Sequence, residues 1–76
     1  MAMIKLISFG KLKEILGSDI DTKAENTDKL MIQINEKFPE LKHFTLRIAV
    51  NQKIVSENTK LKDNDVVALM PPYSGG

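Results

Sequence analysis

Apolar side chains occupy both sides of residues 3–9, a stretch rich in β-branched positions. Ile4 and Leu6 fall on one face of an extended chain, and Ile7 and Phe9 fall on the other. A strand that carries apolar side chains on both faces is typical of the interior of a sheet. We therefore predict an interior β-strand over residues 3–9.

The hydrophobic period changes over residues 11–16, where Leu12, Ile15 and Leu16 fall at helical spacing. Gly17 follows directly, and glycine at this position typically ends a helix. The pattern predicts a short helix that ends at this glycine.

Residues 19–24 alternate strictly, with Ile20, Thr22 and Ala24 on one face and charged side chains between them. Alternation of this kind indicates a strand with one buried and one exposed face. We expect this strand to pair with the first one.

The longest periodic segment begins at Thr27 or Asn26, either of which can serve as the N-cap, and Asp28 suits the first helical turn. Pro39 ends the helix, because a residue before proline is driven out of the α region. A stripe this narrow favours packing on the chain's own sheet over binding a membrane or a partner. The stripe consists of Leu30, Met31, Ile34 and Phe38.

The remaining elements are predicted from alternation and turn residues. Residues 39–44 form an irregular link that can include a 3₁₀ turn. Residues 46–50 alternate as a third strand, and residues 53–55 return as a short fourth strand after a tight turn. Residues 66–70 are apolar at every position, which indicates a central last strand.

Asn64 is the residue expected at positive φ in the turn before the last strand. Its neighbours Asp63 and Asp65 form an acidic cluster, but the glycine and the distal glutamate of an EF-hand calcium loop are missing. Turn formation therefore accounts for this cluster better than calcium binding.

The predicted order is strand, short helix, strand, long helix and then three strands. A long helix across one face of a mixed sheet of four to five strands, with the first and last strands central, is the α+β arrangement called the β-grasp. We expect a β-grasp domain over residues 1–70, with no structural role for Met1 and Ala2, and a flexible C-terminal tail over residues 71–76.

Composition excludes several classes of function. The 76 residues carry a net charge of +1, and no basic face with interleaved aromatics suggests nucleic-acid binding. The absence of cysteine removes disulfides, thiolate metal sites and a cysteine nucleophile, and the lone His43 has no companions for a metal site or a catalytic triad. No segment has the length of a membrane span and no signal peptide precedes the first strand, so we expect a cytoplasmic protein.

The tail itself combines stiffness with a thin tip. Pro71 and Pro72 cannot donate to a sheet ladder, so the last strand must end at or before them. Gly75 and Gly76 have no side chains and can enter a narrow passage. An extended tail reaches on the order of 20 Å beyond the fold. A frayed, inert terminus is the alternative interpretation.

These features together resemble the MoaD family, the small subunits of molybdopterin synthase, which are ubiquitin-like sulfur carriers. The resemblance covers residues 3–76. It rests on an ordered series of short motifs: Ile4-Lys5-Leu6 with Phe9, Lys13-Glu14-Ile15-Leu16-Gly17, Ala49-Val50-Asn51-Gln52, Leu61-x-Asp63-x-Asp65-x-Val67-Ala68, and the terminal Pro71-Pro72-x-Ser74-Gly75-Gly76.

Three positions depart from the family pattern. Asn64 replaces a usual glycine, and Lys13 replaces a commoner arginine, which weakens a bidentate contact to a partner. Tyr73 is bulkier than the usual aliphatic residue, and its role is unexplained.

The resemblance implies that the Gly76 carboxylate is the reactive group. A ubiquitin-activating-like adenylyltransferase adenylates it with ATP, and sulfur from a persulfide donor then gives a thiocarboxylate. The tail, Pro71, Pro72, Tyr73, Ser74 and Gly75 included, enters a channel of the large synthase subunit, where the sulfur builds the dithiolene of molybdopterin. The implied protein is a non-catalytic carrier in a hetero-oligomer, without a bound cofactor or metal.

Alternation and the family pattern together suggest a partner-binding patch of Phe9, Ile54 and Met70, with Lys13 as a further contact. Ordinary packing at the edge of the core is the alternative for each apolar member. Three other functions stay open: a sulfur carrier for thiazole synthesis, which the two prolines disfavour, a protein modifier joined through Gly76 to lysines, and a β-grasp binding module with an inert tail.

Overall fold

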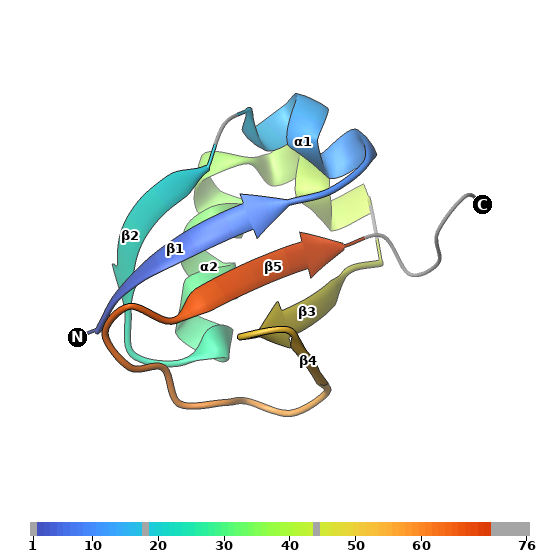
Figure 1. Cartoon of the computed structure of the whole chain (residues 1–76). Helices are drawn as coiled ribbons and strands as arrows, with labels where there is room; N and C mark the ends of the chain where they lie inside the picture. The colour runs from blue at the N-terminus through green and yellow to red at the C-terminus, as the bar shows by residue number, and fades with distance from the viewer. Residues whose placement is uncertain (1, 18, 44, 71–76) are drawn as a thin grey trace.

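The computed structural model describes residues 2–17, 19–43 and 45–70 of the chain. Five strands form one sheet in the order β2-β1-β5-β3-β4 (Figure 1). The elements are β1 (Ala2–Ser8), α1 (Lys11–Leu16), β2 (Ile20–Ala24), α2 (Thr27–Lys37), the 3₁₀ helix η1 (Pro39–His43), β3 (Arg47–Val50), β4 (Lys53–Val55) and β5 (Val66–Met70).

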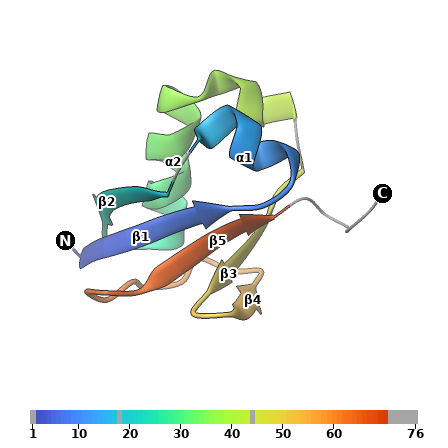
Figure 2. The ribbon, with the colours of Figure 1, turned by 45° about the horizontal axis from the view of Figure 1, so that its top comes forward.

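The sheet is mixed, and the first and last strands lie at its centre. β1 pairs in parallel with β5 and antiparallel with β2, while β5 and β4 both pair antiparallel with β3. All the helices lie on one side of the sheet, and its other side is open (Figure 2). This arrangement confirms the predicted β-grasp fold.

The core lies between the sheet and α2, as the alternation predicts. Ile4 and Leu6 of β1 are each 1% exposed, and Val67 and Leu69 of β5 are fully buried. Leu30 and Ile34 of α2 pack in the same core, and Met31 and Phe38 flank it. Burial of an aliphatic side chain contributes about 1.5–3 kcal/mol, so these residues dominate the stability of the domain. Leu12, Leu16, Leu41 and Leu61 complete the core from α1, η1 and the last loop.

Asn26, and not Thr27, is the N-cap of α2. Its Oδ1 accepts a hydrogen bond from the backbone N–H of Lys29 at 2.8 Å. Thr27 is the first helical residue and is 2% exposed. Its hydroxyl accepts from the N–H of Thr59 at 2.9 Å, while Asn58 Oδ1 accepts from the N–H of Asp28 at 3.0 Å. The loop before β5 is therefore fastened to the start of the helix.

The predicted turns are confirmed by their backbone angles. Asn51 and Gln52, between β3 and β4, have φ of 50° and 72°, and Asn64 has φ of 72°. Gly17 follows α1 at φ 80°, where a side chain would be strained. The link after α2 does contain a 3₁₀ helix, and His43 is its exposed last residue.

The interpretation that Ala2 has no structural role is wrong. Ala2 belongs to β1, where it pairs with Ala24 of β2, and it is only 9% exposed. Its small side chain fits the end of the core, and the extra residue lengthens the β1–β2 ladder. No helix in the described part of the chain is long and apolar enough to cross a membrane.

Candidate docking surface

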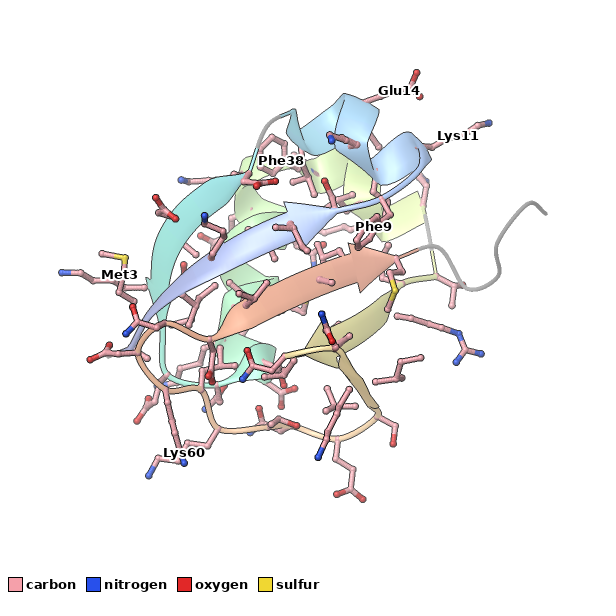
Figure 3. All side chains as sticks on the ribbon, viewed as in Figure 1. Met3, Phe9, Lys11, Glu14, Phe38 and Lys60 are labelled. Carbon is pink, nitrogen blue, oxygen red and sulfur yellow. The ribbon has the colours of Figure 1, made fainter. Side chains whose placement is uncertain are left out.

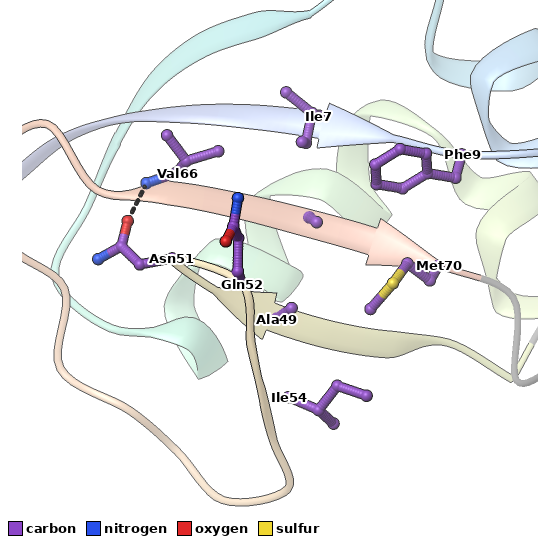
Figure 4. A pocket seen from close by; sticks show the side chains of 9 residues that line it. Ile7, Phe9, Ala49, Asn51, Gln52, Ile54, Val66 and Met70 are labelled. Atoms are coloured by element: carbon purple, nitrogen blue, oxygen red, sulfur yellow. Dashed lines mark hydrogen bonds between the residues drawn. The ribbon is translucent and has the colours of Figure 1, made fainter.

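The open face of the sheet carries the odd-numbered side chains of β1 and the even-numbered ones of β5. Phe9, just beyond β1 (Figure 3), and Met70 at the end of β5 lie together at one end of this face (Figure 4). The register then adds the other strands: Ala68 is opposite Ala49, and Ala49 is opposite Ile54 of β4. Residues from four strands therefore meet beside the end of β5.

These side chains surround a hollow of about 540 Å³, which we call the β5 groove. Its floor is made of small, buried residues, since Ala49 is 4% and Ala68 is 8% exposed. Its walls are large and open to solvent, with Phe9 49% and Ile54 60% exposed, while Met70 is half-buried. The groove is lined by Ile7, Phe9, Ala49, Asn51, Gln52, Ile54, Val66, Ala68 and Met70 (Figure 4).

One end of the groove is closed by a polar network. Asn51 Oδ1 accepts a hydrogen bond from the N–H of Val66 at 3.0 Å, and its Nδ2 donates to Asp65 Oδ1 at 2.9 Å. The other carboxylate oxygen of Asp65 accepts from the N–H of Lys62 at 2.8 Å. The hydrogen bond from Asn51, followed by that from Lys62, lowers the pKa of the Asp65 carboxyl below its ordinary value.

The acidic turn at residues 62–65 is structural. Asp63 Oδ1 accepts a hydrogen bond from the N–H of Met3 at 2.9 Å, and the N–H of Asn64 donates to the carbonyl of Met3 at 2.8 Å. These bonds join the turn to the start of β1, a contact that the sequence did not predict. Across residues 2–17, 19–43 and 45–70, no group of three His, Cys, Asp or Glu residues could hold a metal ion.

The last strand is held on both sides up to its end. The N–H of Phe9 donates to the carbonyl of Leu69 at 3.2 Å, and Met70 is paired with Arg47 of β3. The groove therefore lies directly beside the end of β5, which is held by the Phe9 hydrogen bond on one side and by pairing with β3 on the other.

The structure brings three of the four predicted patch residues together. Phe9, Ile54 and Met70 all line the β5 groove, whereas Lys13 is exposed on α1 and does not line it. The predicted reactive residue Gly76 and the tail residues Pro71, Pro72, Tyr73, Ser74 and Gly75 lie outside the described residues, so their roles stay predictions.

Sequence reasoning missed the floor and the polar end of the groove. Alternation does place Ile7 on the face of Phe9, and Val66 and Ala68 on the face of Met70, but these three residues were not included in the predicted patch. Ala49 and Asn51 could not be found in this way, because the register between β3 and β5 places them and no local pattern encodes that register.

The chain is similar over nearly its full length to known proteins. The ThiS family model matches residues 6–76. The molybdopterin synthase sulfur carrier subunit of Dictyostelium discoideum is 33% identical, with 95% of this chain and 94% of that protein covered. The subunit of the same name from Chlamydomonas reinhardtii is 37% identical, with 96% and 98% covered.

Two solved structures have the same fold. The small archaeal modifier protein 1 of Methanosarcina acetivorans matches with a TM-score of 0.85 and 25% identity, over 100% of this chain and 98% of that one. The complex of subunits 1 and 2 of the molybdopterin-converting factor from Helicobacter pylori contains a chain that matches with a TM-score of 0.75 and 32% identity, over 97% and 99%.

Proposed function

This chain belongs to the ThiS family, and we propose that it is the sulfur carrier subunit of a molybdopterin synthase. The observation that carries the proposal is the match, over nearly the full length, with sulfur carrier subunits that are 33% and 37% identical. The β5 groove adds a surface suited to a protein partner beside the base of the tail.

The proposed chemistry takes place on the Gly76 carboxylate. A carboxylate oxygen attacks the α-phosphorus of ATP in an adenylyltransferase, pyrophosphate leaves, and a glycyl adenylate results. The terminal sulfur of a persulfide donor then attacks the acyl carbon, and AMP leaves with the bonding electrons. Cleavage of the S–S bond by a thiol reductant leaves the thiocarboxylate, which supplies the dithiolene sulfur. The carrier needs no bound cofactor, since its partners use the ATP, and we place these steps in the cytoplasm.

The β5 groove is the proposed docking site for the large subunit of the synthase. Exposed apolar walls around a small-residue floor are typical of the centre of a protein interface. A complex of the two subunits is known for the related converting factor of Helicobacter pylori. Met70 lines the groove and directly precedes the tail in the sequence, so we propose that a partner seated there also receives the tail.

Mass spectrometry of the intact chain tests the chemistry directly. The chain is incubated with its adenylyltransferase, ATP and a sulfur donor, and we expect a mass increase equal to exchange of one oxygen for sulfur. A chain that lacks Gly76 is the matched control and should show no increase. Absence of the exchange in the full chain would refute the proposal.

A protein modifier is the second candidate, favoured by the likeness to the small archaeal modifier protein 1 at a TM-score of 0.85. A modifier forms an amide bond between Gly76 and a lysine of another protein. Cell extracts would then contain conjugates of higher mass that depend on Gly76, whereas a dedicated sulfur carrier gives none.

A further inference from the structure

The chain contains no cysteine and 4 methionines, so thioethers are its only sulfur atoms. The three described methionines lie in different surroundings. Met3 is 45% exposed at the far end of β1 from Phe9 (Figure 3), and Met31 packs against the core from α2. Met70 is half-buried and, among these three, is the one that lines the β5 groove.

We infer that Met70 is an oxidation site at which hydrogen peroxide controls docking on the β5 groove. The inference rests on the proposed function, because that function places the large synthase subunit on the groove. The sulfur lone pair of Met70 attacks one peroxide oxygen, an S–O bond forms and the O–O bond breaks. The displaced hydroxide takes up the remaining proton as water, so the sulfur is oxidised and the peroxide reduced by two electrons.

The surroundings of Met70 make this change costly for a docked partner. Its side chain lies on the apolar side of the groove with Phe9 and Ile54 (Figure 4). The Asn51 amide, which already donates to Asp65, lies at the other end of the groove (Figure 4). Oxidation would place a polar sulfoxide on this apolar side of the groove, where a docked partner covers it, and such a change disrupts an apolar interface.

The position of Met70 also provides access. A half-buried thioether is within reach of a small oxidant in the free protein, whereas a partner on the groove covers it. Linkage makes the two effects reciprocal: if oxidation of Met70 weakens docking, docking disfavours the oxidation of Met70 by the same factor. Methionine sulfoxide is reduced enzymatically, so docking can be restored without new synthesis.

The test compares dissociation constants for the purified large subunit before and after treatment of the full chain with hydrogen peroxide. Peptide mapping records the oxidation of each methionine. We expect docking to weaken about tenfold or more in the wild type and in Met3→Leu, and to stay within about twofold in Met70→Leu relative to its own untreated sample. Bound large subunit should also protect Met70 from peroxide, and Met3 should stay reactive.

Three results would overturn the inference. The first is unchanged docking of wild-type chain that is oxidised at Met70, and the second is equal peroxide sensitivity of Met70→Leu. The third is failure of Met70 to oxidise while Met3 does. If the untreated chain does not bind the large subunit at all, the proposed docking is refuted together with this inference, which separates that failure from the other three.

Discussion

The carboxamide of Asn51 replaces a backbone carbonyl opposite Val66. The N–H of Asn51 donates to the carbonyl of Val66 at 2.8 Å, and the N–H of Val66 donates back to Asn51 Oδ1 at 3.0 Å. The last paired residues of β3 and β5 are Val50 and Val67, and Asn51 then turns away at φ 50°. Asparagine both tolerates this conformation and continues the ladder with its side chain.

This relationship predicts different effects of glycine at two neighbouring positions. Asn51→Gly keeps the positive φ but loses the bonds to Val66 and Asp65, so we expect a loss of about 1–2 kcal/mol in the free energy of unfolding. Gln52 has a φ of 72°, which glycine adopts without strain, and its side chain makes no described hydrogen bond. In Gln52→Gly the free energy of unfolding should therefore stay at the wild-type value or rise by up to about 1 kcal/mol. Urea denaturation measures both, and equal losses would contradict the assigned role.

The decline of the free energy of unfolding at low pH should depend on Asp65. Its pKa is lowered in the folded state, chiefly by the hydrogen bond from Asn51, so the unfolded chain takes up a proton at a higher pH than the folded chain. Asp65 therefore stabilises the fold above the unfolded pKa, about 3.9, and this contribution is lost as the pH falls through the folded pKa.

Urea titrations between neutral pH and about pH 2.5 check this prediction. Asp65→Asn should flatten the decline below about pH 4. Glu25→Gln provides the comparison, because Glu25, just before α2, also has a lowered pKa, in its case through a hydrogen bond from the exposed Lys29. A decline at low pH that Asp65→Asn leaves as steep as in the wild type would show that Asp65 is not linked to folding.

Ile54 and Ile32 form a matched pair for testing the β5 groove. They are 60% and 59% exposed, but Ile54 lines the groove on the open face, whereas Ile32 lies on α2 behind the sheet. Serine at either position should cost less than about 1 kcal/mol of stability. Ile54→Ser should weaken binding of the large subunit about tenfold, whereas Ile32→Ser leaves it unchanged. Calorimetry measures both, and equal affinities would exclude Ile54 from the interface.

Local patterns predicted the elements of the fold well, because each depends on spacing that the sequence shows directly. The two faces of β1 and the stripe of α2 followed from such spacing, and the positive φ of Asn64 followed from its residue type in a turn. The choice between Asn26 and Thr27 could not be made locally, because a loop 32 residues away at Thr59 occupies the Thr27 hydroxyl. The role of Ala2 likewise depends on the register with β2.

The groove was predicted in part for the same reason. Phe9 and Met70 followed from alternation and the family pattern, and the structure places them beside Ile54. Its floor depends on the alignment of Ala49 with Ala68, two small residues that look unremarkable within their own strands. Lys13 was grouped with the patch on the family pattern alone, and in the fold it belongs to α1.

Two variants should separate binding of the large subunit from formation of the thiocarboxylate at Gly76. All described elements of the fold lie within residues 2–70, so a chain without Gly76 should keep its free energy of unfolding and still bind the large subunit, yet form no thiocarboxylate. Phe9→Ala removes an exposed wall of the groove and leaves Gly76 intact, so it should bind the large subunit about tenfold more weakly. Its Gly76 can still be converted to the thiocarboxylate when the activating enzyme is present in excess. Binding constants and intact masses of both variants check this separation.

Molybdopterin synthesis by the chain without Gly76 would favour the alternative of a β-grasp binding module with an inert tail, because sulfur transfer would then not require the terminal carboxylate.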